Sequence, residues 1–487
     1  MMQIFNKKGI LTIQVLIFGS AAIMLSVGLV YWASVAMNSA QIIVSQSTAF
    51  SISEAGIEYY KWHLAHNQTD FQDGTGTSTG PYVHDFYDKD GVLLGNFSLA
   101  ITPPPANSTV VTIISTGTTA NGKFSKSIKV RLGRQSLARY AALTQAANRF
   151  GAGTEIFGPV HSNNGIRFDG LAHNIVTSAV SQYDDPDHSG AQEFGVHTHV
   201  NIPPSLGIND NFRSLEAPTS SVQNRSDVFM AGRSFPVPAV NFSGLTQTLS
   251  DIKSDASSSG GYYPSSTVFG YNLVFKTNDT FDLYKVTTLV SPPSGCTNPG
   301  QDGWGTWSIS SSTLYESNVS FPTSSILFFE DNIWVKGKID GARITVAAGR
   351  FPDLAATNAS ITVNEDLLYT NYDGTDALAL ITQKNINIGF VSSSTLRIDA
   401  ALIAQNGRVG RYYYRPGESY CSSNAFKSSI TTYGMIASNG RYGFAYVGGT
   451  GYALRNLSFD PNLAYEPPPG FPISSSEQYA MISWEEL

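Results

Sequence analysis

The chain has 487 residues, of which 42% are hydrophobic and only 14% charged, and its formal net charge is −7. A negative balance argues against non-specific nucleic-acid binding, which needs a basic surface. The length allows two or three domains, and the 44 Gly, 24 Tyr and 27 Phe residues fit extracellular β structure, where turns need glycine and strands favour aromatic side chains.

The first predicted element is a long apolar helix. Residues 10–53 contain no Asp, Glu, Lys or Arg, and the first half of this run exceeds the roughly 20 apolar residues that span a bilayer core. A secretory signal peptide has an apolar part of only about 7–15 residues, so this run is too long to be one. Glu54 and Glu58 follow at helical spacing. The pattern predicts one helix over residues 10–66, membrane-spanning in its first half.

A small sheet is predicted after the helix, in a domain over residues 67–134. The sequence Asp88-Lys89-Asp90-Gly91 is a strong hairpin-turn signal between two alternating segments. Two further strand patterns follow, and the second alternates apolar and polar side chains. The prediction is an antiparallel four-stranded meander with strands over residues 82–87, 92–102, 109–115 and 124–132.

The remaining chain, residues 135–487, is predicted to form a large β-rich domain. Short apolar pairs, each ended by Gly, Asn or Asp, recur over residues 326–409. Strands this short are stable when stacked as rungs of a β-solenoid. We therefore favour a parallel β-helix, while the irregular repeat keeps a β-sandwich open. Residues 182–322 are interpreted as a polar insertion, and the C-terminal tail is Pro-rich.

The N-terminal motif resembles a known processing signal. Lys7-Lys8-Gly9 before the apolar residue Ile10 resembles the class III signal of type IV pilins and pseudopilins. The resemblance implies cleavage after Gly9 by a prepilin peptidase and N-methylation of Ile10. In this family the fifth mature residue is usually Glu, whose carboxylate neutralises the N-terminal ammonium of a neighbouring subunit, whereas this chain has Gln14. Minor subunits at the filament tip are the ones that tolerate this loss.

Four further segments resemble large, tip-type minor pilins of the PilX kind. They are the helix segment with Glu54 and Glu58, residues 160–163 (VHSN), residues 399–402 and the Pro-rich C-terminal tail. It implies a structural subunit of a type IV pilus-like filament that displays its β-rich domain for adhesion or filament initiation. The implied partners are other pilin subunits through the helix, the inner-membrane assembly machinery, the prepilin peptidase and a surface or glycan ligand.

The implied location is the cytoplasmic membrane for the precursor and then the cell surface, in an extracellular filament. An ordinary single-span membrane anchor is the alternative interpretation of the apolar helix.

Few residues suggest site chemistry. Cys296 and Cys421 can close one long-range disulfide in an oxidising compartment, and two separate thiols are the alternative. His197 and His199 are the best metal candidates, because residues two apart on a strand point to the same face. Asp184, Asp185, Asp187 and His188 lie upstream, but the spacing fixes no third ligand, so no metal or cofactor is predicted.

An enzyme is the alternative function. Parallel β-helices also form polysaccharide lyases and hydrolases, which need clustered carboxylates. Candidate carboxylates are Glu330, Asp331, Glu365, Asp366, Asp373 and Asp376. No GxSxG, HExxH, Walker A or CxxC motif occurs in the sequence, so a non-enzymatic protein is predicted and a membrane-anchored carbohydrate-active enzyme is the alternative.

Overall fold

The structure is a computed structural model that describes residues 7–77, 79–105, 108–242, 244–298, 300–417, 419–471 and 478–487. The chain divides into two compact units. Unit 1 comprises residues 1–104, 110–133 and 478–487, and unit 2 comprises residues 105–109 and 134–477. Residues 1–6 of the predicted leader lie outside the described residues, as does the side chain of Ile10.

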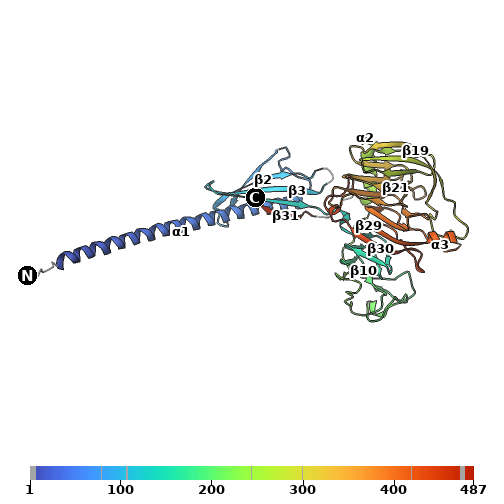
Figure 1. Ribbon diagram of the computed structural model, residues 1–487, viewed down its shortest axis with the longest axis horizontal. Helices are drawn as coiled ribbons and strands as arrows, with labels where there is room; N and C mark the ends of the chain where they lie inside the picture. The colour runs from blue at the N-terminus through green and yellow to red at the C-terminus, as the bar shows by residue number, and fades with distance from the viewer. Residues whose placement is uncertain are drawn as a thin grey trace, which may run out of the picture. The chain divides into compact units, whose positions relative to one another are not determined.

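Unit 1 is built on one helix, α1 (Lys7–His66), which has 60 residues and is seen along its whole length in Figure 1. Its C-terminal part packs on a sheet through the buried side chains Ile52, Ile57, Tyr60 and Leu64. The helix begins three residues before the predicted start at residue 10 because the basic leader residues continue the helical backbone.

Two glycines allow the helix and the sheet to approach closely. A Cβ atom at Gly56 would collide with the side chains of Ser115 and Phe97. A Cβ atom at Gly117, on the sheet, would collide with the backbone of α1 at Ala49 and Ser53. Backbone therefore packs against backbone at this crossing, which only glycine permits.

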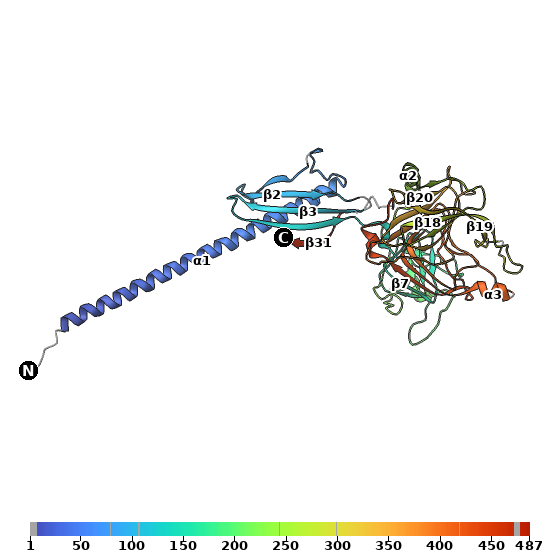
Figure 2. The same ribbon diagram turned by 45° about the horizontal axis from the view of Figure 1, so that its top comes forward.

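The sheet of unit 1 has five strands and not the four that were predicted. Strands β1 (Tyr82–Tyr87), β2 (Leu93–Thr102), β3 (Val110–Thr119) and β4 (Ser125–Gly133) form the antiparallel meander. The C-terminal strand β31 (Ala480–Glu486) pairs antiparallel with β4. Figure 2 shows β31 next to the C-terminus. Trp484 of β31 packs edge-on against Phe50 of α1, with ring centroids 6.1 Å apart. The C-terminal strand, which lies within the predicted domain over residues 135–487, thus completes the sheet of unit 1.

Unit 2 contains a long ladder in which every pairing is parallel. Its strands are, in spatial order, β16 (Tyr262–Tyr263), β20 (Ile326–Phe329), β22 (Arg343–Ala348), β25 (Ala377–Thr382), β27 (Thr395–Ala404), β29 (Phe426–Ser438), β5 (Ala142–Thr144), β8 (Val160–Ser162), β11 (Val176–Ser178) and β15 (Arg233–Ser234). Strand β5, at the start of unit 2, therefore pairs with β29, near its end. The chain enters this ladder in its middle.

Three further groups of parallel strands accompany this ladder. The first joins β17 (Tyr271–Phe275), β21 (Ile333–Lys338), β23 (Ile361–Thr362), β26 (Ile386–Ile388) and β28 (Val409–Arg411). The second is a separate sheet that joins β14 (Val196–His197), β9 (Ile166–Phe168) and β6 (Asn148–Phe150). The third joins β24 (Leu367–Leu368), β27, β29, β30 (Gly451–Phe459), β7 (Thr154–Phe157) and β10 (Leu171–Ala172). In register, Ile333, Ile361, Ile386 and Val409 stack in one buried core.

The predicted insertion over residues 182–322 is corrected in part. Strands β14 to β17 of this segment belong to the parallel ladders. Strands β12 (Gln182–Tyr183) and β13 (Glu193–Phe194) form a separate antiparallel hairpin, and β18 (Thr280–Leu289) and β19 (Ile309–Ser320) continue from β17 as antiparallel strands. The composition was misleading because these ladder strands are as short as two residues and lie between long polar loops.

A short helix covers the outer face of the first ladder. Helix α2 (Gly244–Ser259) connects β15 to β16, which are the two ends of that ladder. Its buried residues Leu249, Ile252 and Ala256 form a second apolar core with Ile326, Phe328 and other outward-facing ladder residues. Alternate residues of one strand thus pack into different cores, as the pleat requires.

A disulfide joins Cys296 to Cys421 at the start of α3 (Ser419–Ala425), with 5.4 Å between the Cα atoms. Both cysteines are buried with Phe390, Tyr412 and Tyr414 in a small aromatic cluster. The bond ties together two segments that are 125 residues apart in the sequence.

Candidate functional site

The N-terminal part of α1 is an apolar surface with no partner inside unit 1. Residues 11–44 are all exposed, including Phe18 (73%), Met24 (74%) and Trp32 (69%). At 1.5 Å per residue, this stretch is about 50 Å long, more than the ~30 Å of a bilayer core. Among the residues that the structure describes, α1 is the one helix long and apolar enough to span a membrane. So large an apolar surface requires cover from lipid or from other helices.

The polar residues that the pilin resemblance singles out lie on the free surface of this helix. Gln14 is exposed within the apolar stretch. Glu54 and Glu58 are exposed on the side of α1 that faces away from the sheet, and Glu58 lies 3.6 Å from Lys61. Their placement leaves all three available to another molecule.

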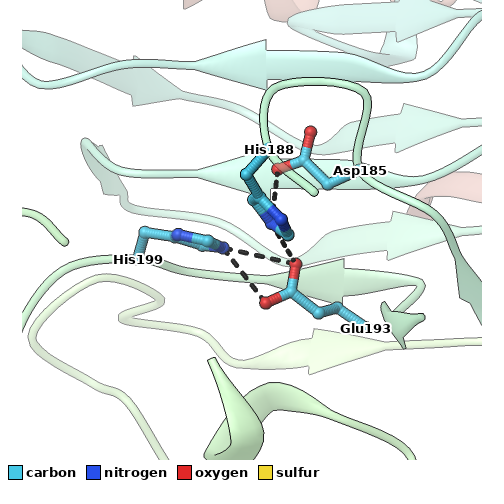
Figure 3. A group of neighbouring side chains, drawn as sticks. All are labelled: Asp185, His188, Glu193 and His199. Atoms are coloured by element: carbon cyan, nitrogen blue, oxygen red, sulfur yellow. Dashed lines mark hydrogen bonds and ion pairs between the residues drawn. The ribbon is translucent and has the colours of Figure 1, made fainter. Parts of the chain in front are cut away.

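A second candidate site is a buried group of histidines and carboxylates in unit 2. The hairpin of β12 (Gln182–Tyr183) and β13 (Glu193–Phe194) begins it, and its loop carries Asp185 and His188. Strand β14 and the residue two beyond it supply His197 and His199. We call these five residues the histidine–carboxylate cluster. Figure 3 shows the Glu193 carboxylate between the rings of His188 and His199, with Asp185 beside His188.

One carboxylate lies near three imidazole rings. Glu193 Oε2 is 3.0 Å from His188 Nε2 and 3.1 Å from His197 Nε2, and Glu193 Oε1 is 3.2 Å from His199 Nε2. Asp185 Oδ2 lies 3.6 Å from His188 Nε2 and 3.5 Å from His197 Nε2. Glu193, His197 and His199 are fully buried and Asp185 is 2% exposed. Three ring nitrogens and two carboxylates thus converge on one dry point.

The surroundings favour the ionised form of both carboxyl groups. Burial alone would raise the pKa of Asp185, but the interactions with His197, with the backbone N–H of Asp187 and with Arg167 outweigh it and hold the pKa well below its usual range. For Glu193, burial is likewise outweighed by the nearby histidines and by the backbone N–H of Arg213, so its pKa is lowered. Polar neighbours therefore offset the cost of burying both carboxyl groups.

Sequence reasoning found only part of this cluster. It singled out His197 and His199 and noted the acidic residues upstream, but it missed Glu193. Glu193 could have been found from its position in the sequence. It lies four residues before His197, on the second strand of a hairpin whose loop carries Asp185. No sequence pattern for a two-residue strand makes that hairpin visible.

The carboxylates considered for an enzyme are engaged in structural contacts. The Asp376 carboxylate accepts hydrogen bonds from the backbone N–H groups of Ala342, Thr370 and Asn371. The Asp331 carboxylate binds Ser266 and Arg350. The other four bind Lys253, Lys336, Thr375 and the backbone of Arg397, as the pairs Glu330–Lys253, Glu365–Lys336, Asp373–Thr375 and Asp366–Arg397. These contacts account for each carboxylate without a substrate.

Known proteins give limited guidance. No protein-family model matches the chain, and no curated protein sequence matches it. Among solved structures, the chain is similar to the crystal structure of the competence-associated pilin ComZ from Thermus thermophilus. The sequence identity is 11%, the TM-score is 0.28, and the match covers 91% of this chain and 98% of that chain. A TM-score of this size does not establish a shared fold.

Proposed function

We propose that this protein is a subunit of a type IV pilus-like filament, made as a membrane-anchored precursor and then assembled through α1. The observation that carries the proposal is the difference in surroundings between the two parts of α1. Residues 11–44 are exposed and apolar, whereas the following turns are fixed on the sheet of unit 1 by Ile52, Ile57 and Tyr60. A helix held at one end and bare at the other can leave lipid and pack against copies of the same surface.

Unit 2 is the part that such a filament would display. We interpret its parallel ladders as the rungs of a β-solenoid that begins at residue 262, runs to 438 and continues from 142 to 234. The stacked register of Ile333, Ile361 and Ile386 supports this interpretation, because rungs bury apolar side chains in one continuous core. In this arrangement unit 2 is inserted between β4 and β31 of unit 1, and the display of a surface for adhesion or filament initiation is its proposed role.

Gln14 supports a special position in the filament. A buried N-terminal ammonium needs a negative partner, and a neutral amide cannot cancel its charge. A subunit with no neighbour above it does not have to supply that partner. We therefore place this subunit at or near the filament tip.

Mass spectrometry of the mature N-terminus tests the proposal. Surface filaments from the native cell are expected to yield a chain that starts at a methylated Ile10, and a Gly9→Val variant is expected to stay unprocessed in the membrane fraction. A mature protein that keeps residues 1–9, or that starts at another residue, would refute a pilin-type subunit.

Tip placement needs a separate measurement. Immunogold labelling of unit 2 is expected at filament ends. Labelling spread evenly along the shaft would contradict the tip placement, while the filament role itself would remain.

A further inference from the structure

The hydrogen bonds of two histidines in the cluster fix a proton on Nδ1 of each ring. His199 Nδ1 lies 2.8 Å from the backbone oxygen of Asn209, and His197 Nδ1 lies 3.3 Å from that of Phe194. A carbonyl oxygen only accepts hydrogen bonds, so each Nδ1 must carry the proton. In the neutral ring, Nε2 then presents a lone pair to the Glu193 carboxylate. At both contacts an acceptor nitrogen then lies against a carboxyl oxygen, an arrangement that is stabilised either by a metal ion between them or by a second proton on the ring.

Three buried polar atoms in the cluster also lack hydrogen bonds. They are Asp185 Oδ2, His188 Nδ1 and His197 Nε2, and of these residues Asp185 is 2% exposed and His197 is fully buried. The nearest guanidinium is that of Arg167, which binds Asp169 through Nε and Asp210 through Nη2, while its Nη1 lies 3.6 Å from Asp185 Oδ2 and also makes no hydrogen bond. Buried polar atoms are normally satisfied, so Asp185 Oδ2 and His197 Nε2, which lie 3.5 Å apart, indicate a missing partner.

The spacing of the donor atoms fits one ion. The printed pairs of nitrogen and oxygen atoms are 3.0 to 3.6 Å apart, and single donor atoms of Asp185, His188, Glu193 and His199 all lie within 4.8 Å of one another. Four donors at ~2.0–2.2 Å around a tetrahedral metal are separated from each other by about 3.3–3.6 Å. The cluster is therefore close to the size of a first coordination shell.

We propose that the histidine–carboxylate cluster binds one divalent transition-metal ion of the zinc type, with Asp185, His188, Glu193 and His199 as ligands and His197 Nε2 as an adjacent fifth donor. Imidazole nitrogen suits zinc and its neighbours, whereas calcium and magnesium prefer oxygen ligands alone. The hydrogen bonds from His197 and His199 to backbone carbonyls are of the kind that orients metal-binding histidines.

The role of the ion is structural. Three of the four ligands are buried and His188 is partly buried, which leaves little access for a substrate, as in closed structural sites. The ion joins the loop of the β12–β13 hairpin, which carries Asp185 and His188, to the chain beyond β14, which carries His199. It would hold a segment that has only two-residue strands, and it is independent of the proposed filament role.

The test is metal binding by the full-length, untagged chain in detergent. Protein stripped with a chelator and then given zinc is expected to retain one equivalent after gel filtration, measured by elemental mass spectrometry, and to melt several degrees higher than the stripped form. With cobalt in place of zinc, the unmodified chain is expected to show the visible absorption of a four-coordinate nitrogen and oxygen site.

Variants separate this site from adventitious binding. Asp185→Asn, which keeps the shape of the side chain, and His199→Ala are expected to weaken zinc binding tenfold or more. His173→Ala is the matched control, because His173 lies 2.7 Å from Glu155 in a partly exposed pair outside the cluster. Zinc that binds equally to Asp185→Asn and the wild type, or a wild type that retains no zinc and shows no cobalt absorption, would overturn the proposal in favour of an ion-pair network with protonated histidines.

Discussion

The close contact between α1 and the sheet gives the sharpest stability prediction, for the variant Gly117→Ala. The added methyl group would meet the α1 backbone at Ala49 and Ser53, which cannot rotate away as a side chain would. The helix must therefore move off β3. Its buried side chains Ile52, Ile57 and Tyr60, together with Leu64, would lose contact with the sheet.

The size of the effect follows from those four side chains. Full burial of each is worth about 1.5–3 kcal/mol. A gap of 0.5–1 Å forfeits a quarter or more of the contact energy. The loss is then about 2–3 kcal/mol, from which the burial of one methyl group returns about 0.8 kcal/mol. We expect unit 1 of Gly117→Ala to be less stable by about 2 kcal/mol, which corresponds to a melting temperature lower by roughly 5–10 °C.

Differential scanning calorimetry of the full chain in detergent measures this change, and hydrogen exchange of peptides from β3 locates it. Gly443→Ala is the matched control, because a Cβ atom there meets nothing within 4 Å. Equal melting of Gly117→Ala and the wild type, with unchanged exchange in β3, would refute the close packing of α1 on the sheet.

Three other predictions follow from single features. Replacing Cys296 and Cys421 by Ser is expected to destabilise unit 2 by about 4–5 kcal/mol in the chain-entropy model, and a calorimetric transition that does not move would contradict it. Burial, together with the nearby Arg411 charge, lowers the pKa of Lys427 to about 8. Between pH 8 and 10 the unfolded chain therefore binds more protons at this lysine than the folded chain does. The free energy of unfolding should then rise with pH in the wild type and rise less in Lys427→Met. Chemical denaturation at each pH measures this difference. Deletion of residues 478–487 removes β31 and the Trp484–Phe50 contact, and β4 amides should then exchange faster; unchanged protection of β4 would show that β31 does not stabilise the sheet.

The elements that sequence predicted well are those whose signal is local. The apolar run that begins at residue 10 identifies α1 because hydrophobicity and helical spacing are read along one continuous segment. The strand predicted over residues 82–87 coincides with β1, and the one over residues 124–132 differs from β4 by a single residue at each end. Alternating side chains and a strong hairpin turn are sufficient for such strands.

The long-range pairings between strands could not be predicted from the sequence. Nothing local shows that β31 pairs with β4, although Lys126 and Glu486 meet across 360 residues of chain. The same holds for β5, which pairs with β29, and for the two-residue strands within residues 182–322. A strand of this length acquires its identity from the neighbours that hydrogen-bond to it.

The candidate metal site divides in the same way. The sequence determined which donor types are present and that His197 and His199 are two residues apart. Only the tertiary structure brought Glu193 and Asp185 to them, because the hairpin between β12 and β13 folds back over β14. A ligand set is a property of distances in space, and those distances were set by ladder pairing and burial, which no local pattern encodes.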